Sequence, residues 1–191
     1  MKKLGLGLII ALLVLIMVPV AQAVTQDVNI SATVAQSLTF TVSDATIYFG
    51  TLGSGAAKYA STTEGGDTVA VPAHTMQAAT NATGGYSIAV TGSTLTSGDD
   101  TITAIGATSV ASSAGTEQFG VRLSSVSGGG TVATEYGTAD EFAYLTTDQV
   151  ASNATVTAAD VYSATYIANI AALTEAGSYS TTLTYTATGS F

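Results

Sequence analysis

The last fifteen residues of the chain alternate between two kinds of side chain. One set is Tyr179, Thr181, Leu183, Tyr185, Ala187, Gly189 and Phe191, and the other is Ser180, Thr182, Thr184, Thr186 and Thr188. A period of two is that of a β-strand with one buried and one wet face. Stiff β-branched Thr side chains suit the outer face of such a strand. The pattern therefore predicts that the chain ends in a half-buried strand of a sheet.

The same alternation recurs upstream in shorter pieces that are separated by Gly-rich turns. The strands predicted from it are residues 28–34, 38–42, 46–52, 68–72, 74–80, 86–91, 101–105, 119–123 and 161–170. Residues 138–145 fit a helical turn capped by Thr138, and a strand over residues 142–145 fits equally well. The short link 174–177 predicts a hairpin between 161–170 and the final strand. Turn signals every 8–15 residues, roughly, are typical of an all-β sandwich or barrel.

The first 23 residues have the three parts of an export signal. Lys2 and Lys3 supply positive charge, residues 4–20 are apolar, and Ala21-Gln22-Ala23 is a small-x-small cleavage box. An uncleaved membrane anchor is the competing interpretation, because the apolar run approaches the length of a bilayer span. We expect cleavage after Ala23, which leaves a single domain over residues 24–191. The expected location is secreted or at the cell surface.

Charge is sparse and mostly negative. Only 9% of the residues are charged, and the formal net charge is −9. Loss of the leader leaves Lys58 and Arg122 as the basic residues, against 13 acidic ones. Such a chain repels nucleic acid and anionic lipid, so neither is an expected partner, nor is a membrane once the signal is removed. With no Cys, neither disulfides nor thiol chemistry is available.

Few residues suggest chemistry. The single histidine, His74, has no nucleophile motif near it, so we predict no enzymatic activity and no catalytic residues. Acidic pairs in turns are weak Ca²⁺ candidates, although no EF-hand pattern is present: Asp99 with Asp100, and Asp140 with Glu141. No other cofactor is expected. Asn29, Asn81 and Asn153 begin Asn-x-Ser/Thr acceptor sequences for glycosylation.

Three stretches together resemble bacterial exported surface proteins. They are residues 47–52, 85–92 and 176–188, which read IYFGTL, GYSIAVTG and AGSYSTTLTYTAT. The resemblance is to spore-coat-U-like and pilin-like secreted proteins and to WxL-type cell-surface domains, without their hallmark Cys and Trp. It implies an immunoglobulin-like or jelly-roll antiparallel β-sandwich, and the alternation along the chain gives about nine to eleven short strands for it. It also implies a structural or adhesive role at the cell surface, with no catalytic residues.

Three functions follow as expectations. The first is a secreted or cell-surface structural or adhesion protein whose partners are other surface proteins, cell-wall glycans or copies of itself. The second is a carbohydrate- or ligand-binding module, in which loop tyrosines such as Tyr59 and Tyr136 stack on sugars. The third is an outer-membrane barrel, suggested by the terminal Phe191.

The stretch after the cleavage site raises a question of assembly. Val28, Ile30, Ala32 and Val34 form a regular apolar face, yet chain termini are usually loose unless they are tied into a sheet. Residues 24–34 are expected to be the first strand of the chain's own sandwich. The alternative is that they add to the sheet of a neighbouring copy.

Overall fold

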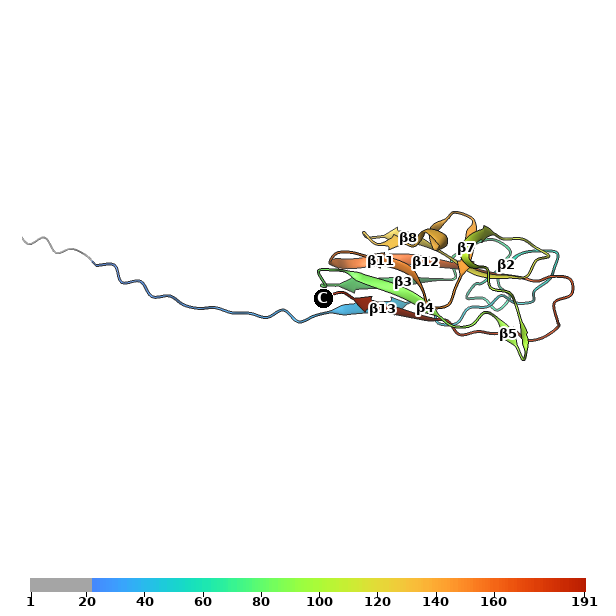
Figure 1. Ribbon diagram of the computed structural model, residues 1–191, viewed down its shortest axis with the longest axis horizontal. Coiled ribbons are helices and arrows are strands. Elements are labelled where there is room, and N and C mark those ends of the chain that lie inside the picture. The colour runs from blue at the N-terminus through green and yellow to red at the C-terminus, as the bar shows by residue number, and fades with distance from the viewer. Residues whose placement is uncertain (1–21) are drawn as a thin grey trace, which may run out of the picture. The chain divides into compact units, whose positions relative to one another are not determined.

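The structure, a computed structural model that describes residues 22–191, is built almost entirely of antiparallel strands (Figure 1). The strands are β1 (Leu38–Val42), β2 (Lys58–Tyr59), β3 (His74–Thr80), β4 (Tyr86–Thr91), β5 (Thr96–Ser97), β6 (Asp100–Thr101), β7 (Gly106–Ala111), β8 (Gln118–Ser127), β9 (Thr131–Val132), β10 (Glu141–Tyr144), β11 (Asp148–Asn153), β12 (Thr157–Asn169) and β13 (Thr184–Gly189). One short helix, α1 (Thr134–Gly137), interrupts them. The predicted all-β fold is confirmed.

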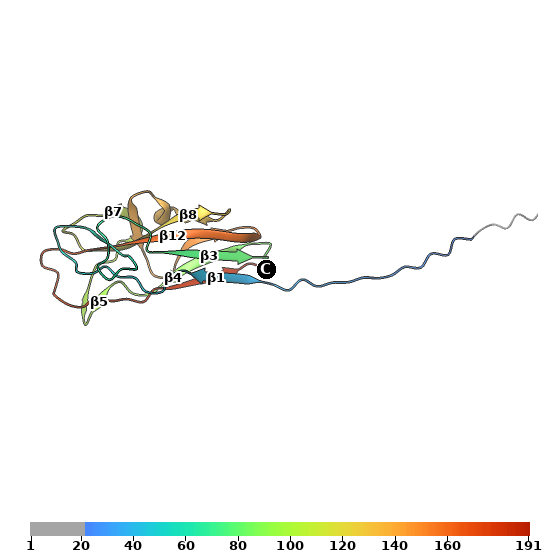
Figure 2. The ribbon, with the colours of Figure 1, turned by 180° about the vertical axis from the view of Figure 1, so that it is seen from behind.

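Two sheets face each other across one core. The larger has the order β1-β3-β12-β8-β10-β7, with β2 also bonded to β12, and the smaller has the order β13-β4-β11-β9. A separate small hairpin pairs β5 with β6. Neither sheet closes on itself, so β1 and β13 are both edge strands. Figure 2 shows β1 and β3 in front of the smaller sheet.

The core is made by inward side chains of both sheets. The fully buried residues include Met76, Leu123, Tyr162 and Ala164 from the larger sheet and Ile88, Val90 and Val150 from the smaller. In β4 the buried residues alternate with half-buried ones, as the sequence pattern predicts. Burial of such side chains supplies most of the stabilisation, because each contributes about 1.5–3 kcal/mol relative to exposure.

The final strand is real but shorter than predicted, and its partner differs. β13 begins at Thr184, and before it only Ser180 makes an isolated bridge, to Thr96. β13 pairs with β4, in the register Thr184↔Thr91 to Gly189↔Tyr86, and not with β12. The predicted hairpin is therefore wrong: residues 170–183 carry the chain from the larger sheet to the smaller one.

Other predictions are corrected in the first half of the domain. Residues 46–52 hold only one bridge, Tyr48 to Ser61, and residues 68–72 form no strand. Gly50 adopts φ +67 where it approaches the carbonyl of Gly65, a contact that a Cβ would block. The chain bends there, and residues 46–52 do not form a regular strand.

Further along the chain, the ambiguity at residues 138–145 is resolved as strand β10, while α1 ends before it. Strands β7 and β11 were missed because their sequences mix small and polar residues with no clear alternation. The predicted strand at 101–105 is reduced to the first residue of that range, within β6.

The segment before β1 is not the first strand of this sandwich. The chain divides into a unit that ends at Val34 and a compact unit of Ala35–Phe191. In the first unit, residues 22–34 contain neither helix nor strand, and all are exposed. The expectation that residues 24–34 pair within their own sheet is therefore wrong. The export signal up to residue 21 lies outside the described residues, and within 22–191 there is no helix long and apolar enough to cross a membrane.

Substitutions on the inner and outer faces of the sandwich should have different effects on stability. Ile88→Ala is expected to lower the free energy of unfolding by about 2–5 kcal/mol, because it leaves a cavity between the sheets. Thr188→Ala, on the exposed face of β13, should change it by less than about 0.5 kcal/mol. Urea denaturation measures both, and equal effects would contradict the assigned inner face.

Candidate functional site

The most unusual feature of the domain lies beside its first and last strands. β1 is bonded only to β3 and β13 only to β4, so each has an edge with no strand partner among residues 22–191. The two strands approach each other but belong to different sheets. In Figure 2 they lie together at the same side of the domain. Within the described residues, each sheet therefore has a free strand edge on this side of the domain.

A cavity of about 1200 Å³ lies where β1 ends and β13 begins. Its lining comes from residues 42–52, which follow β1, and from residues 174–185, which lead into β13. Core side chains complete it, among them His74, Phe119 and Tyr166. We call this cavity the seam groove. The first and last strands of the domain thus border a groove that reaches the core.

Half-buried hydrophobic side chains mark the same side. Most of those packed against the core without being covered come from β1, β13 and the segments next to them: Leu38, Phe40, Ile47, Phe49, Leu52, Tyr179, Leu183, Tyr185 and Ala187. By contrast, the inner residues of β4 and β8 are fully buried. The core is closed over the central strands and incomplete at the seam groove.

A chain of three polar rings lies in the groove. His74 Nε2 and Tyr166 Oη are 2.7 Å apart, and Tyr166 Oη and Tyr185 Oη are 2.8 Å apart. Because His74 and Tyr166 belong to the larger sheet and Tyr185 to the smaller, these hydrogen bonds link the two sheets. Burial lowers the pKa of His74, against smaller opposing effects of the Thr75 backbone and the Asp44 charge. The imidazole is therefore mostly neutral at pH 7.

This arrangement lacks the contacts of a nucleophilic triad. His74 Nε2 is taken by a tyrosine instead of a serine, and within residues 22–191 Nδ1 has no hydrogen-bond partner. Burial also raises the pKa of Tyr166 and Tyr185, so both phenols remain protonated. The three rings can donate and accept hydrogen bonds in the groove.

A second buried polar centre surrounds Asp160 of β12. The side chain is fully buried, and its Oδ2 accepts hydrogen bonds from Asn153 Nδ2 at 2.7 Å and Tyr86 Oη at 2.8 Å. Oδ1 accepts from the amides of Gly129 at 2.8 Å and Gly130 at 3.1 Å. Burial acts to raise the pKa of Asp160, but these hydrogen bonds outweigh it and hold the pKa below its ordinary value.

The Asp160 centre joins parts that are far apart in sequence. It connects β12 to β4 and β11 of the other sheet and to the loop after β8. Sequence reasoning missed it, although one signal existed: an acidic residue inside a strand is unusual and requires partners. Since both oxygens are already bonded, the centre is a structural tie between the sheets.

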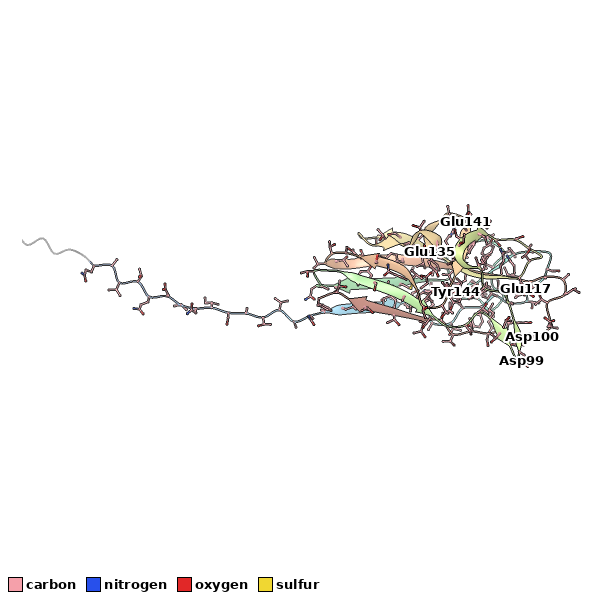
Figure 3. All side chains as sticks on the ribbon, in the orientation of Figure 1. Asp99, Asp100, Glu117, Glu135, Glu141 and Tyr144 are labelled. Atoms are coloured by element: carbon pink, nitrogen blue, oxygen red, sulfur yellow. The ribbon has the colours of Figure 1, made fainter. Side chains whose placement is uncertain are left out.

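The four weak Ca²⁺ candidates are not brought together. Asp99 and Asp100 lie at the β5–β6 hairpin, whereas Glu141 lies in β10 on another part of the domain (Figure 3). Asp140 pairs with Arg122 at 3.1 Å, and Glu141 accepts a hydrogen bond from Ser109. Over the described chain no group of three or more His, Cys, Asp or Glu side chains could hold a metal ion.

The loop tyrosines proposed for sugar stacking are not exposed platforms. Tyr136 lies in α1 and is fully buried, with its hydroxyl donating to Asp148. Tyr59 is half-buried in β2 and packs on the ring of Phe142, with centroids 6.1 Å apart. The expectation that both tyrosines are exposed in loops is wrong, because Tyr136 is part of the core and Tyr59 packs at its margin.

The three glycosylation acceptor sequences differ sharply in accessibility. Asn29 is exposed. Asn153 is buried and donates to Asp160, and Asn81 uses both ends of its amide to bind the backbone of residues 35–37. A glycan on Asn81 or Asn153 would have to break these contacts.

The Asp160 centre predicts a specific loss of stability in acid. Because its pKa is lowered in the folded state, its contribution is present above the ordinary pKa and is lost as pH falls through the folded value. Asp160→Asn should reduce the free energy of unfolding at pH 7 by on the order of 3 kcal/mol, since hydrogen bonds to a charge are lost. Asp99→Asn, at an exposed position, is the matched control.

Chemical denaturation of wild type and variant between pH 7 and pH 2 is the measurement. The difference in the free energy of unfolding between wild type and Asp160→Asn is expected to decrease as the pH falls. A difference that stays constant over this range would contradict the lowered pKa of Asp160.

The seam groove and the exposed segment before β1 are two features of residues 22–191 that the packing of the sandwich does not explain. In comparisons with protein-family models, curated proteins and solved structures, nothing matches this chain. Function is therefore inferred from these two features.

Proposed function

We propose that this protein is a non-catalytic structural or adhesive protein of the cell surface, and that it assembles by strand addition. The segment that is added is residues 24–34, named here the extension, and the acceptor is the seam groove of another copy. One observation carries the proposal. The same chain has an exposed strand-like segment and a groove that reaches the core where β1 ends and β13 begins.

The extension has the pattern of a strand without the sheet. Val28, Ile30 and Val34 are 81%, 90% and 84% exposed, and the intervening residues are polar or small. Covering each of these side chains would contribute about 1.5–3 kcal/mol, which is lost while they face water. Apolar side chains that alternate over seven residues suit a strand that binds in a groove beside the edge of a β-sheet.

The seam groove offers what such a strand needs. The edges of β1 and β13 carry backbone groups that can pair with an added strand, and exposed edges of this kind readily recruit one. Half-buried Ile47 from the segment after β1, and Leu183 and Tyr185 from the segment that leads into and begins β13, line the groove with apolar surface. Eleven extended residues span about 36 Å, enough to follow an edge strand and the adjoining groove.

The surface location is supported by the sequence. The leader before Val24 has the pattern of an export signal, and the acidic, Cys-free chain suits neither nucleic acid nor thiol chemistry. Cleavage after Ala23 would place the extension at the very start of the mature chain. Copies of the protein itself are the first expected partners, and other surface proteins with a comparable extension are the second.

The test uses the chain that begins at Val24. Size-exclusion chromatography with light scattering is expected to show oligomers that grow with concentration. Ile30→Asp should abolish them while leaving the fold intact, because it places a charge on the apolar face. Ser31→Asp, one residue along and on the opposite face, should leave them in place.

Deletion of residues 24–34 extends the same test. Folded monomers after deletion support strand addition, whereas an unfolded protein would show that the extension belongs to its own sandwich. Antibody labelling of intact cells checks the location, and a uniformly cytoplasmic distribution would contradict it.

A further inference from the structure

The chain enters the sandwich through a clamp formed by Asn81. The Asn81 amide nitrogen donates to the carbonyl of Ala35 at 2.8 Å, and its Oδ1 accepts from the amide of Ser37, also at 2.8 Å. The backbone amide of Asn81 and the hydroxyl of Thr80 both donate to the carbonyl of Ser37, at 3.2 Å and 2.9 Å. Four hydrogen bonds therefore hold residues 35–37.

The clamp and the seam groove lie at opposite ends of the domain. Along β3, Asn81 follows the last residue, Thr80, whereas His74 is the first residue and lines the groove. The seven residues of β3 separate them by about 20 Å. The registers agree, since Leu38 pairs with Thr80 and Val42, at the groove, pairs with Met76. Figure 1 shows the C-terminus at the clamp end and the 43–70 loops at the other.

The clamp fixes residues 35–37, so to enter the groove of its own subunit the extension would have to turn back within residues 24–34. It would then run about 20 Å beside β1 before reaching residues 42–52. The turn and this run take up most of its eleven residues, so little of the extension is left to lie in the groove. Insertion along its length therefore requires that the hydrogen bonds of the clamp break or that residues are added before Ala35.

We propose that Asn81 is a positioning residue that keeps the extension out of its own groove and directs it to a second copy. This inference rests on the proposed function. Because the exit and the groove are at opposite ends, each copy gives its extension at one end and receives one at the other. Such head-to-tail contact between unlike surfaces builds an open chain of copies instead of a closed dimer.

The experiment compares wild type with four variants, all in the chain that begins at Val24. Asn81→Ala removes both side-chain bonds of the clamp, and Asn81→Asp keeps the acceptor for Ser37 but loses the donor to Ala35. Thr83→Ala destroys the same glycosylation sequence without touching the clamp, so it is the matched control. The fourth version inserts six Gly/Ser residues between Val34 and Ala35, which lets the chain turn before an intact clamp.

The measurements are light scattering over a range of concentrations and hydrogen exchange of the extension. In wild type and Thr83→Ala, protection of the extension should rise with concentration as copies join. In Asn81→Ala and in the insertion variant, protection should become independent of concentration and the monomer fraction should rise roughly tenfold. Asn81→Asp should fall between them.

Two outcomes would overturn the inference, and Ile30→Asp in the same series tells them apart. If wild type assembles, Ile30→Asp does not, and both the Asn81→Ala and the insertion variants assemble like wild type, then strand addition stands and the clamp does not direct it. If wild type stays monomeric at every concentration and Ile30→Asp changes nothing, the proposed function fails as well. The insertion variant leaves the sandwich sequence unchanged, so it remains informative if Asn81→Ala does not fold.

Discussion

The structure depends on a core that its own strands do not finish covering. Over β4, β8 and β12 the two sheets exclude water completely, but between β1 and β13 the inner side chains of Phe40, Leu183 and Tyr185 remain half-buried. Since burial of apolar area is the main stabilising contribution, this side is where the domain can still gain stability. The extension carries exposed apolar side chains with the spacing of a strand, and their burial would also be stabilising.

Two networks of polar side chains link the two sheets. The Asp160 centre joins the two sheets near the clamp end, and the His74–Tyr166–Tyr185 chain joins them in the groove. In these networks the side chains of Asp160, Tyr86, Asn153, His74 and Tyr166 are buried and that of Tyr185 is half-buried, so partial loss of either network would leave unpaired buried groups. The networks therefore link the two sheets at both ends of the sandwich.

Much of the fold could be predicted from alternation alone, and its failures have physical causes. β1, β3 and β4 could be predicted because more buried residues alternate with less buried ones. β8 and β12 could be predicted from the alternation of large and small side chains in their sequences, although much of each strand is buried on both faces. β13 was predicted with the wrong partner, because a short link suggests a hairpin but does not determine which sheet the strand joins. The Asp160 centre depends on contacts between residues 7 to 74 positions apart in the sequence. The Asn81 clamp depends on contacts between residues 44 and 46 positions apart. Local sequence patterns do not predict such contacts.

The central claim is that the extension of one copy lies in the seam groove of another. Disulfide trapping tests it directly, because the chain has no Cys of its own. One version would carry Leu183→Cys, and a second, separately tagged, would carry a single Cys at Val28, Asn29, Ile30 or Ser31. After mixing under mild oxidation, mixed disulfide-linked dimers should form with Cys at 28 or 30 and not at 29 or 31. Equal trapping at all four positions, or none at any, would contradict the account.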